Sequence, residues 1–287
     1  MTLDFELQYK IRALTIKKER PDKTPSTTIS INNIASISQK SGISCREAEF
    51  ASLEAEIIPE RYVRNMGSFS LFDQATLLRS KASIVGLGGL GGTVTEILAR
   101  TGTGTLNLID GDIFEESNLN RQYLCTERLI STPKADAAAK RVKEINSSVT
   151  VFHHSKYLNK DNAPDLIEDS DVIIDCLDSL SGRFILEKAS KKAGCRLVSA
   201  AVAGNYGHIT TIFPEDTGLK LIYGDAENRP DKGAETSLGT LSHCVSLVAS
   251  LEASEAIKII LKKGSLLRNR LLLVDLTDNS FETMQLL

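Results

Sequence analysis

A cluster of glycines in the first half of the chain has the spacing of a phosphate-binding turn. Gly86, Gly88, Gly89 and Gly91 follow an apolar run that begins at Ala82 and precede a stretch of helical periodicity. Glycines at a strand-to-helix turn let backbone amides approach an anion at the helix N-terminus. The pattern predicts that a phosphate binds here, although a glycine-rich turn required only for tight packing has the same appearance.

A carboxylate follows at the position where a nucleotide ribose is commonly held. Asp110 lies 24 residues after Gly86, at the end of the next predicted strand. A carboxylate at that point of a doubly wound fold reaches the ribose hydroxyls. The glycines and Asp110 together predict a nucleotide site. They fit a nicotinamide-dependent oxidoreductase as well as an ATP-using enzyme.

Acidic, cationic and amide side chains are concentrated after this carboxylate. When a carboxylate attacks the α-phosphorus of ATP, charge builds on the departing pyrophosphate, and cations and amide donors stabilise it. Arg121 and Lys134 have the chemistry for that task, whereas each taken alone is more commonly a solvated surface residue. The candidates among the polar residues in this part of the chain are Asp112, Asn118, Arg121, Gln122 and Lys134.

The spacing of these residues resembles the signature of a known superfamily. D-G-D at 110–112 and N-L-N-R-Q at 118–122 are similar to the aspartate pair and the Asn-x-x-Arg-Gln run of the ubiquitin-activating enzyme superfamily, in its MoeB/ThiF/HesA branch. The resemblance implies ATP as cofactor and catalytic roles for Arg121 and Lys134. It also implies that the nucleotide and its phosphates contact Gly86, Gly88, Gly89, Gly91, Asp110, Asp112, Asn118, Arg121, Gln122 and Lys134.

A second aspartate pair predicts where magnesium would bind. Asp178 stands just past the apolar run 172–175, at the carboxyl edge of a predicted strand. Magnesium bound to nucleotide phosphates usually takes one or two protein carboxylates. The run resembles the family's D-C-x-D-N, with Ser179 in place of the usual asparagine, which implies a catalytic, metal-binding Asp178. Asp175 fits a strand-end cap equally well, so we rank it second.

An arginine upstream of the glycines implies a dimer. The run 60–65, E-R-Y-V-R-N, resembles the Arg-Tyr-x-Arg-Gln motif that opens the family's core domain. In the family the second arginine reaches the ATP of the partner subunit, so the resemblance implies a catalytic Arg64 acting in trans within a homodimer. The apolar stretch 241–261 resembles a helix near the family's dimer interface, and its composition fits a buried core helix as well.

Apolar runs alternate with helical patterns from Ala82 onward, which is typical of a doubly wound α/β fold. We predict a Rossmann-like sheet, parallel in its first half with an antiparallel C-terminal part, plus a small mainly helical N-terminal extension. Thr132 and Pro133 indicate an N-cap and a first-turn proline for a helix that ends at Asn146. The expected strands are 82–85, 105–109, 149–153, 172–175, 197–200, 208–213, 271–275 and 281–286.

We predict a division into an N-terminal extension, residues 1–58, and an ATP-binding adenylyltransferase domain, residues 59–287. The extension reads as a loop over 20–27 followed by two short helices joined around Gly42, an outline that lacks the basic face of a DNA-binding helix pair. A second long loop is expected over 214–239, where Gly and Pro recur without a pattern.

Composition limits the partners. The 34 basic and 37 acidic residues give a formal net charge of -3, so we expect no nucleic-acid or membrane partner. The charged N-terminus and the absence of an eighteen-residue apolar run predict a cytoplasmic protein. Five scattered cysteines include no C-x-x-C pair, which predicts free thiols and no zinc.

The simplest functional hypothesis is adenylation without thiol chemistry. The family resemblance implies an adenylyltransferase that activates the C-terminal glycine carboxylate of a small ubiquitin-like sulfur carrier ending in Gly-Gly and releases pyrophosphate. The loop near 233–239 contains no cysteine, and Cys244 and Cys125 are more commonly structural. Alternatives are adenylation of a peptide or a tRNA base, and a nucleotide-binding regulatory pseudo-enzyme. The sequence identifies neither the carrier nor its pathway.

Overall fold

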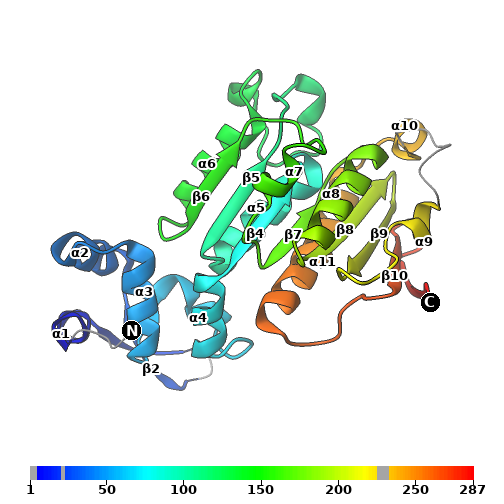
Figure 1. The fold of residues 1–287 in the computed structure, drawn as a ribbon. Coiled ribbons are helices and arrows are strands. Elements are labelled where there is room, and N and C mark those ends of the chain that lie inside the picture. Colours follow the sequence, from blue (N-terminus) through cyan, green and yellow to red (C-terminus); the bar gives the residue numbers. More distant parts are fainter. Residues whose placement is uncertain (1–4, 21–22, 225–232) are drawn as a thin grey trace.

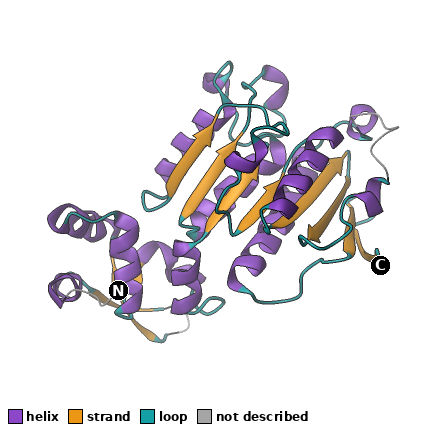
Figure 2. Ribbon diagram, in the orientation of Figure 1, coloured by secondary structure: helices purple, strands orange, loops and turns teal. Residues whose placement is uncertain are grey.

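The computed structural model describes residues 5–20, 23–224 and 233–287. An eight-stranded sheet forms its centre, with the strand order β11-β10-β9-β8-β7-β4-β5-β6 (Figures 1 and 2). Strands β6, β5, β4, β7 and β8 run parallel, and β9, β10 and β11 continue antiparallel. This confirms the predicted fold class. The strands are β4 Lys81–Val85, β5 Thr105–Ile109, β6 Thr150–His154, β7 Val172–Asp175, β8 Arg196–Ala203, β9 Tyr206–Ile212, β10 Arg270–Asp275 and β11 Ser280–Gln285.

The central strands are buried on both faces, which explains their continuous apolar runs. The β4 residues Ala82 and Ile84 pack into one core with helices α5 Gly89–Thr101, α6 Lys134–Ile145 and α11 Ser242–Leu261. Val85 packs into the other core with α7 Ala163–Leu166 and α8 Leu180–Lys192. The sheet is therefore covered by helices on both sides, as Figure 1 shows.

The chain reverses its direction of travel across the sheet at β4. From β4 it adds β5 and β6 on one side, and it then returns to place β7 on the other side of β4. In open α/β sheets a crevice forms at such a reversal, outside the carboxyl ends of the two strands, and ligands bind there. The glycine turn after β4 and the aspartates that end and follow β7 meet at this point.

Two predicted helix boundaries can be compared with the structure. Helix α6 starts at Lys134 with Pro133 as its N-cap, so the predicted cap at Thr132 was wrong; the Thr132 side chain makes no capping hydrogen bond. The main-chain amide of Lys134 instead donates to the carbonyl of Asp112, at 2.9 Å, which fixes where the helix begins. Asn146 ends α6 as predicted.

The N-terminal extension contains a small sheet as well as helices. Helices α2 Ile31–Ser41 and α3 Cys45–Glu54 are joined around Gly42, as expected, because Gly42 takes the left-handed conformation (φ 66) that ends α2. The predicted loop over 20–27 was wrong in part, since residues from Pro25 onward belong to a strand; residues 21 and 22 of that prediction lie outside the described part. The remaining elements are α1 Phe5–Ala13, β1 Ile16–Glu19, β2 Pro25–Ile29 and β3 Ile58–Pro59, with β2 antiparallel to β1 and parallel to β3.

The extension rests against the large sheet's helices through a buried tyrosine. Tyr62, in the 3₁₀ segment Glu60–Asn65, donates its hydroxyl hydrogen to Glu49 of α3, at 3.1 Å, and accepts one from Asn146 at the end of α6, at 3.0 Å. Arg46 of α3 donates to the carbonyl of Gly104, at 3.0 Å. The proposed division at residues 58 and 59 falls within β3, which pairs with β2 of the extension.

Short elements complete the described chain. Helix α4, Leu71–Arg79, connects the extension to β4, and the stretch predicted as a loop over 214–239 contains two single-turn helices, α9 Lys220–Tyr223 and α10 Glu235–Leu238. Each of these helices is a single turn that ends at a glycine, which is too short to show a helical pattern in the sequence. Residues 225–232 of that prediction lie outside the described part. No helix of the described chain has the length and apolar character needed to span a bilayer.

Candidate functional site

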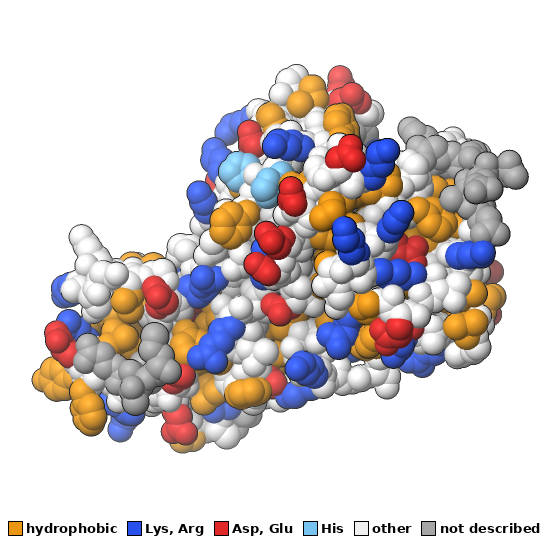
Figure 3. Space-filling model, in the orientation of Figure 1, with side chains coloured by type: hydrophobic (Ala, Val, Ile, Leu, Met, Phe, Trp, Pro, Cys, Tyr) orange, Lys and Arg blue, Asp and Glu red, His pale blue; other side chains and the backbone are white. Residues whose placement is uncertain are grey.

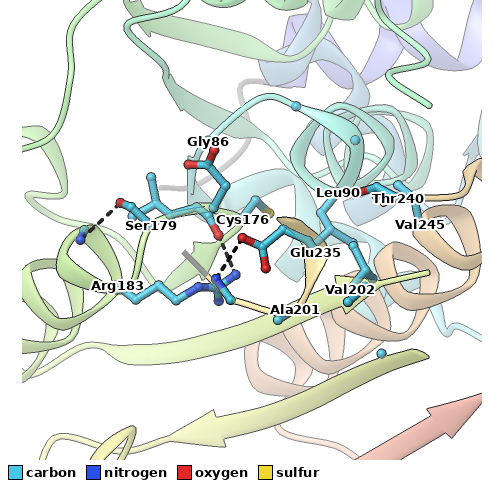
Figure 4. Close-up of a pocket in the computed structure, with 18 of the residues that line it drawn as sticks. Gly86, Leu90, Cys176, Ser179, Arg183, Ala201, Val202, Glu235, Thr240 and Val245 are labelled. Carbon is cyan, nitrogen blue, oxygen red and sulfur yellow. Dashed lines mark hydrogen bonds between the residues drawn. The ribbon is translucent and has the colours of Figure 1, made fainter. Parts of the chain in front are cut away.

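A cavity of about 1350 Å³ opens along the carboxyl edge of the sheet, at the reversal beside β4. Figure 4 shows Gly86 and Leu90 of the glycine turn and α5, Cys176 and Ser179 beyond β7, and Ala201 and Val202 of β8 around the same space. Of the predicted site residues, the cavity is lined by Gly86, Gly88, Gly89, Asp110, Asp112, Arg121, Gln122, Lys134 and Asp178. It is not lined by Gly91, Asn118 or Arg64.

The glycines of the turn have two different tasks. Gly88 is the N-cap of α5 and makes no side-chain cap, and Gly88, Gly89 and Leu90 line the cavity, so the N-terminus of this helix borders it. Gly86 has a left-handed backbone (φ +89), and a Cβ there would lie 2.5 Å from the carbonyl oxygen of Cys176. A Cβ at Gly91 would lie 1.8 Å from the carbonyl oxygen of Gly86. Gly91 therefore allows α5 to approach the turn, and it is not part of the cavity wall.

Asp110 supports the turn from the end of β5. Its Oδ2 accepts a hydrogen bond from the amide of Leu87, at 2.6 Å, and its Oδ1 accepts one from the amide of Asp112, at 2.8 Å. Burial raises the pKa of Asp110, and these two hydrogen bonds only partly offset that effect. The carboxylate fixes the glycine turn and still borders the cavity.

Asp112 and Lys134 form an ion pair at the cavity wall. Lys134 Nζ lies 3.0 Å from Asp112 Oδ2, and the Lys134 side chain is 8% exposed while that of Asp112 is 49% exposed. Burial alone would raise the pKa of Asp112, but hydrogen bonds from Tyr157 and Lys134 outweigh it and lower the pKa. The lysine ammonium is thus held in place at the cavity wall.

In the amide and arginine run after β5, some side chains line the cavity and others support the backbone. Arg121 faces the cavity, with its guanidinium donating to the Ser117 carbonyl at 2.9 Å and to Asn120 Oδ1 at 2.8 Å. Gln122 is buried at the wall, and its Oε1 has no hydrogen-bond partner among the described residues. Asn118 was expected to line the phosphate path, but its buried side chain accepts from the Glu115 amide, at 3.0 Å, and caps a 3₁₀ turn instead.

The two aspartates near the end of β7 differ in exposure. Asp178 is exposed at the cavity wall, and none of the described residues is hydrogen-bonded to its side chain. Ser179 is the N-cap of α8, its Oγ accepting from the Gly182 amide at 3.3 Å, so serine keeps a capping side chain where the family has asparagine. Asp175 is fully buried and accepts from Ser199 at 2.6 Å. Within the described ranges, no three His, Cys, Asp or Glu side chains are grouped closely enough to hold a metal ion.

Arg183 is a cavity residue that the sequence motifs do not mark. Its guanidinium contacts Asp175, at 3.0 Å, and donates to the carbonyls of Ala200, at 2.8 Å, and Leu177. It is 4% exposed and links the ends of β7 and β8 beneath the cavity. Its partners lie on two other strands, so the sequence alone does not distinguish it from a solvated helical arginine.

A histidine and a tyrosine were also missed. His208 Nε2 lies 2.9 Å from the hydroxyl of Tyr223, and both side chains border the cavity between β9 and α9. Burial and the nearby Arg183 cation lower the pKa of His208 to about 4, so its imidazole is neutral near pH 7. Neither residue belongs to a recognisable motif.

The remaining predicted residues lie away from the cavity. Arg64 is exposed and makes no hydrogen bond or ion pair with any described residue. Cys125 and Cys244 are buried, and burial raises the pKa of both thiols. Protonated, buried thiols are typical of structural cysteines.

The fold and the cavity define a nucleotide-binding α/β protein, and the comparisons with known proteins assign its family. The model of the ThiF family matches residues 62–286. The SAMP-activating enzyme E1 of Haloferax volcanii is 33% identical over 230 residues, 78% of this chain and 84% of the relative. The chain belongs to the ThiF family, and it is an adenylyltransferase of the type that activates ubiquitin-like modifiers.

Two further comparisons extend this result. The adenylyltransferase and sulfurtransferase uba4 of Emericella nidulans is 35% identical over 215 residues, which are 71% of this chain and 45% of the relative, so the chain spans about half the length of that protein. The crystal structure of E. coli MccB with AMPCPP and MccA superposes with a TM-score of 0.69 at 21% identity, covering 98% of this chain and 87% of MccB. At that identity the likeness concerns the fold, with the N-terminal extension included.

Proposed function

We propose that this protein uses ATP to adenylate the C-terminal glycine carboxylate of a small ubiquitin-like sulfur-carrier protein. The observation that carries the proposal is the convergence of one helix N-terminus, two cations and one exposed carboxylate on a single cavity: the turn at Gly86–Gly89, Arg121, Lys134 and Asp178. Amides and cations suit a triphosphate, and an exposed carboxylate suits the magnesium that accompanies it.

In the proposed reaction the carrier carboxylate attacks the α-phosphorus. A new bond forms between a carboxylate oxygen and that phosphorus, and the bond from the phosphorus to the bridging oxygen of pyrophosphate breaks. Arg121 and Lys134 stabilise the charge that develops on the leaving pyrophosphate. Asp178 would hold the magnesium, which shields the phosphate charges when bound. Asp110 would orient the ribose.

The half of the cavity farther from the glycine turn favours a substrate tail that has no bulky side chains. It is lined by Ala201, Val202 and Ala203 of β8, by Gly207 of β9, and by residues between Gly233 and Gly239. A Cβ at Gly207 would lie 2.4 Å from Val248 in the core, so α11 packs directly against this strand. A Gly-Gly terminus fits such a lining, and relatives named for activating SAMP and for adenylyltransfer with sulfurtransfer favour a carrier of this kind.

The proposal also includes the oligomeric state and the cellular location of the protein. A homodimer would bring the exposed Arg64 of one subunit to the ATP of its partner, and the near-neutral charge fits a cytoplasmic enzyme without a nucleic-acid partner. Figure 3 shows basic and acidic side chains interspersed over the visible face. We propose a peptide as the alternative substrate. MccB was crystallised with MccA, and the likeness of this chain to MccB includes the N-terminal extension.

Pyrophosphate exchange into ATP tests the proposal. The full chain is assayed with magnesium and with Gly-Gly-ending carrier proteins in turn, then with peptides. Exchange that depends on one carrier, and falls about a hundredfold or more in Arg121→Ala, Lys134→Ala and Asp178→Ala, is the expected result. The exposed residues Arg128, Lys140 and Asp161 provide matched alanine controls that should keep activity. Exchange with peptides alone would move the assignment to the alternative.

A further inference from the structure

Tyr157 is connected to the proposed phosphate-binding lysine through one carboxylate. Its hydroxyl donates to Asp112 Oδ1, at 2.7 Å, while Oδ2 of the same carboxylate contacts Lys134 Nζ, at 3.0 Å. The three residues come from different elements: Asp112 follows β5, Lys134 begins α6, and Tyr157 lies in the segment after β6. The carboxylate is therefore held from both sides.

The segment after β6 rests directly on the turn that carries Asp112. A Cβ at Gly111 would lie 2.6 Å from the backbone nitrogen of Tyr157 and 2.6 Å from its Cγ. Since β6 lies beside β5 at the edge of the sheet, the two segments leave the sheet as neighbours (Figure 1). The tyrosine hydroxyl is placed by backbone packing, although the residue is 69% exposed.

A lysine needs such support more than an arginine would. Its ammonium is a point charge on a flexible stem, so its position depends on the anion that holds it. Asp112 is half exposed and, without a second hydrogen bond, would be free to rotate and carry the ammonium with it. Because the Tyr157 hydroxyl occupies Oδ1 of Asp112, Oδ2 accepts from the Lys134 ammonium. The remaining ammonium hydrogens are then available to phosphate oxygens.

We propose that Tyr157 is a positioning residue for Lys134, acting through Asp112 on the binding of the ATP phosphates. This assignment rests on the proposed nucleotide site and assigns to the segment after β6 a role that no signature motif of the chain marks. Tyr157 borders the cavity beside Asp110, so contact with the nucleoside itself is the competing explanation that the experiment must separate.

The test compares two ligands and two variants of the full chain by calorimetry. Tyr157→Phe keeps the ring and removes the hydroxyl. It should weaken Mg·ATP binding about threefold to tenfold. This is less than the full effect of a charge-assisted hydrogen bond, because the lost bond acts on Lys134 only through Asp112. Adenosine, which has no phosphates for Lys134 to contact, should bind within about twofold of its original affinity. Tyr9→Phe, on an exposed tyrosine of α1, is the matched control and should change neither affinity.

A double-mutant comparison identifies the route. In an Asp112→Ala background, Tyr157→Phe should have no further effect on Mg·ATP binding, because the connection to Lys134 is already broken. An equal loss in both backgrounds, or an equal loss for adenosine, would overturn the assignment in favour of direct nucleoside contact. If the unaltered chain bound no Mg·ATP, the proposed function and this assignment would both fail. Normal binding by Tyr157→Phe would reject this assignment alone.

Discussion

The carboxylate of Asp110 accepts a hydrogen bond of 2.6 Å from the amide of Leu87, so the end of β5 holds the glycine turn that follows β4. Asp110→Asn should loosen this turn and weaken ATP binding about tenfold, since a charge-assisted hydrogen bond contributes about that factor. Calorimetric titration with Mg·ATP measures it, with Asp161→Asn as an exposed control. Unchanged affinity would show that the turn does not depend on this carboxylate.

The same variant makes a prediction about stability against pH. Burial raises the folded-state pKa of Asp110 above its unfolded value of about 3.9, so ionisation favours the unfolded chain. Its contribution to stability therefore falls as pH rises from the unfolded pKa through the folded pKa. Asparagine does not titrate, and Asp110→Asn should gain melting temperature relative to the unaltered chain between pH 4 and pH 7. A difference that is constant over this interval would contradict the sign.

Ser179 should contribute to stability through its capping hydrogen bond to Gly182. Ser179→Ala should lower the free energy of unfolding by about 1 kcal/mol, the usual value of an N-cap. Ser179→Asn restores the family's residue and keeps a capping side chain, so it should stay within about 0.5 kcal/mol. Urea denaturation of both variants decides this. Equal losses would mean that the site does not tolerate replacement, whatever the cap.

The buried pair of Arg183 and Asp175 should be costly to break on one side. Among the described residues, Arg183→Met leaves the fully buried Asp175 carboxylate with only Ser199 and the Leu177 amide as partners, and we expect a loss of about 3–5 kcal/mol. Adding Asp175→Asn should recover part of it, because the uncompensated charge is removed. Chemical denaturation of the single and double variants measures both. A double variant less stable than the single one would contradict the electrostatic explanation.

Cys244 should have no part in catalysis. It is buried beside the carbonyl of Tyr206, 3.5 Å from its sulfur, and burial raises its pKa. Cys244→Ala should keep pyrophosphate exchange within about twofold, the range of a core change without a chemical role. Under native conditions an alkylating reagent should modify the partly exposed Cys45 before Cys244, as mass spectrometry can follow. A carrier thioester on Cys244 would overturn this prediction.

The parts of the site that sequence predicts are those set by local geometry. Gly86 and Asp110 lie at strand ends, and strand ends are readable from apolar runs. Asn118 belongs to the same motif but faces a 3₁₀ turn, which spacing along the chain does not reveal. Arg183 was missed because its partners lie on β7 and β8. Likewise β2 is rich in Ser and Thr, and its extended conformation depends on pairing with β1 and β3.

The contact between Gly91 and the Gly86 carbonyl has a consequence for how such chains diverge. A side chain at position 91 would overlap the backbone at position 86. Glycine is therefore required at position 91 for the chain to fold, whatever the activity. A descendant that lost Arg121 or Asp178 would still need both glycines. Under the proposed function, the glycines would therefore reflect the requirements of the fold, whereas Arg121 and Asp178 would indicate whether adenylation has been retained.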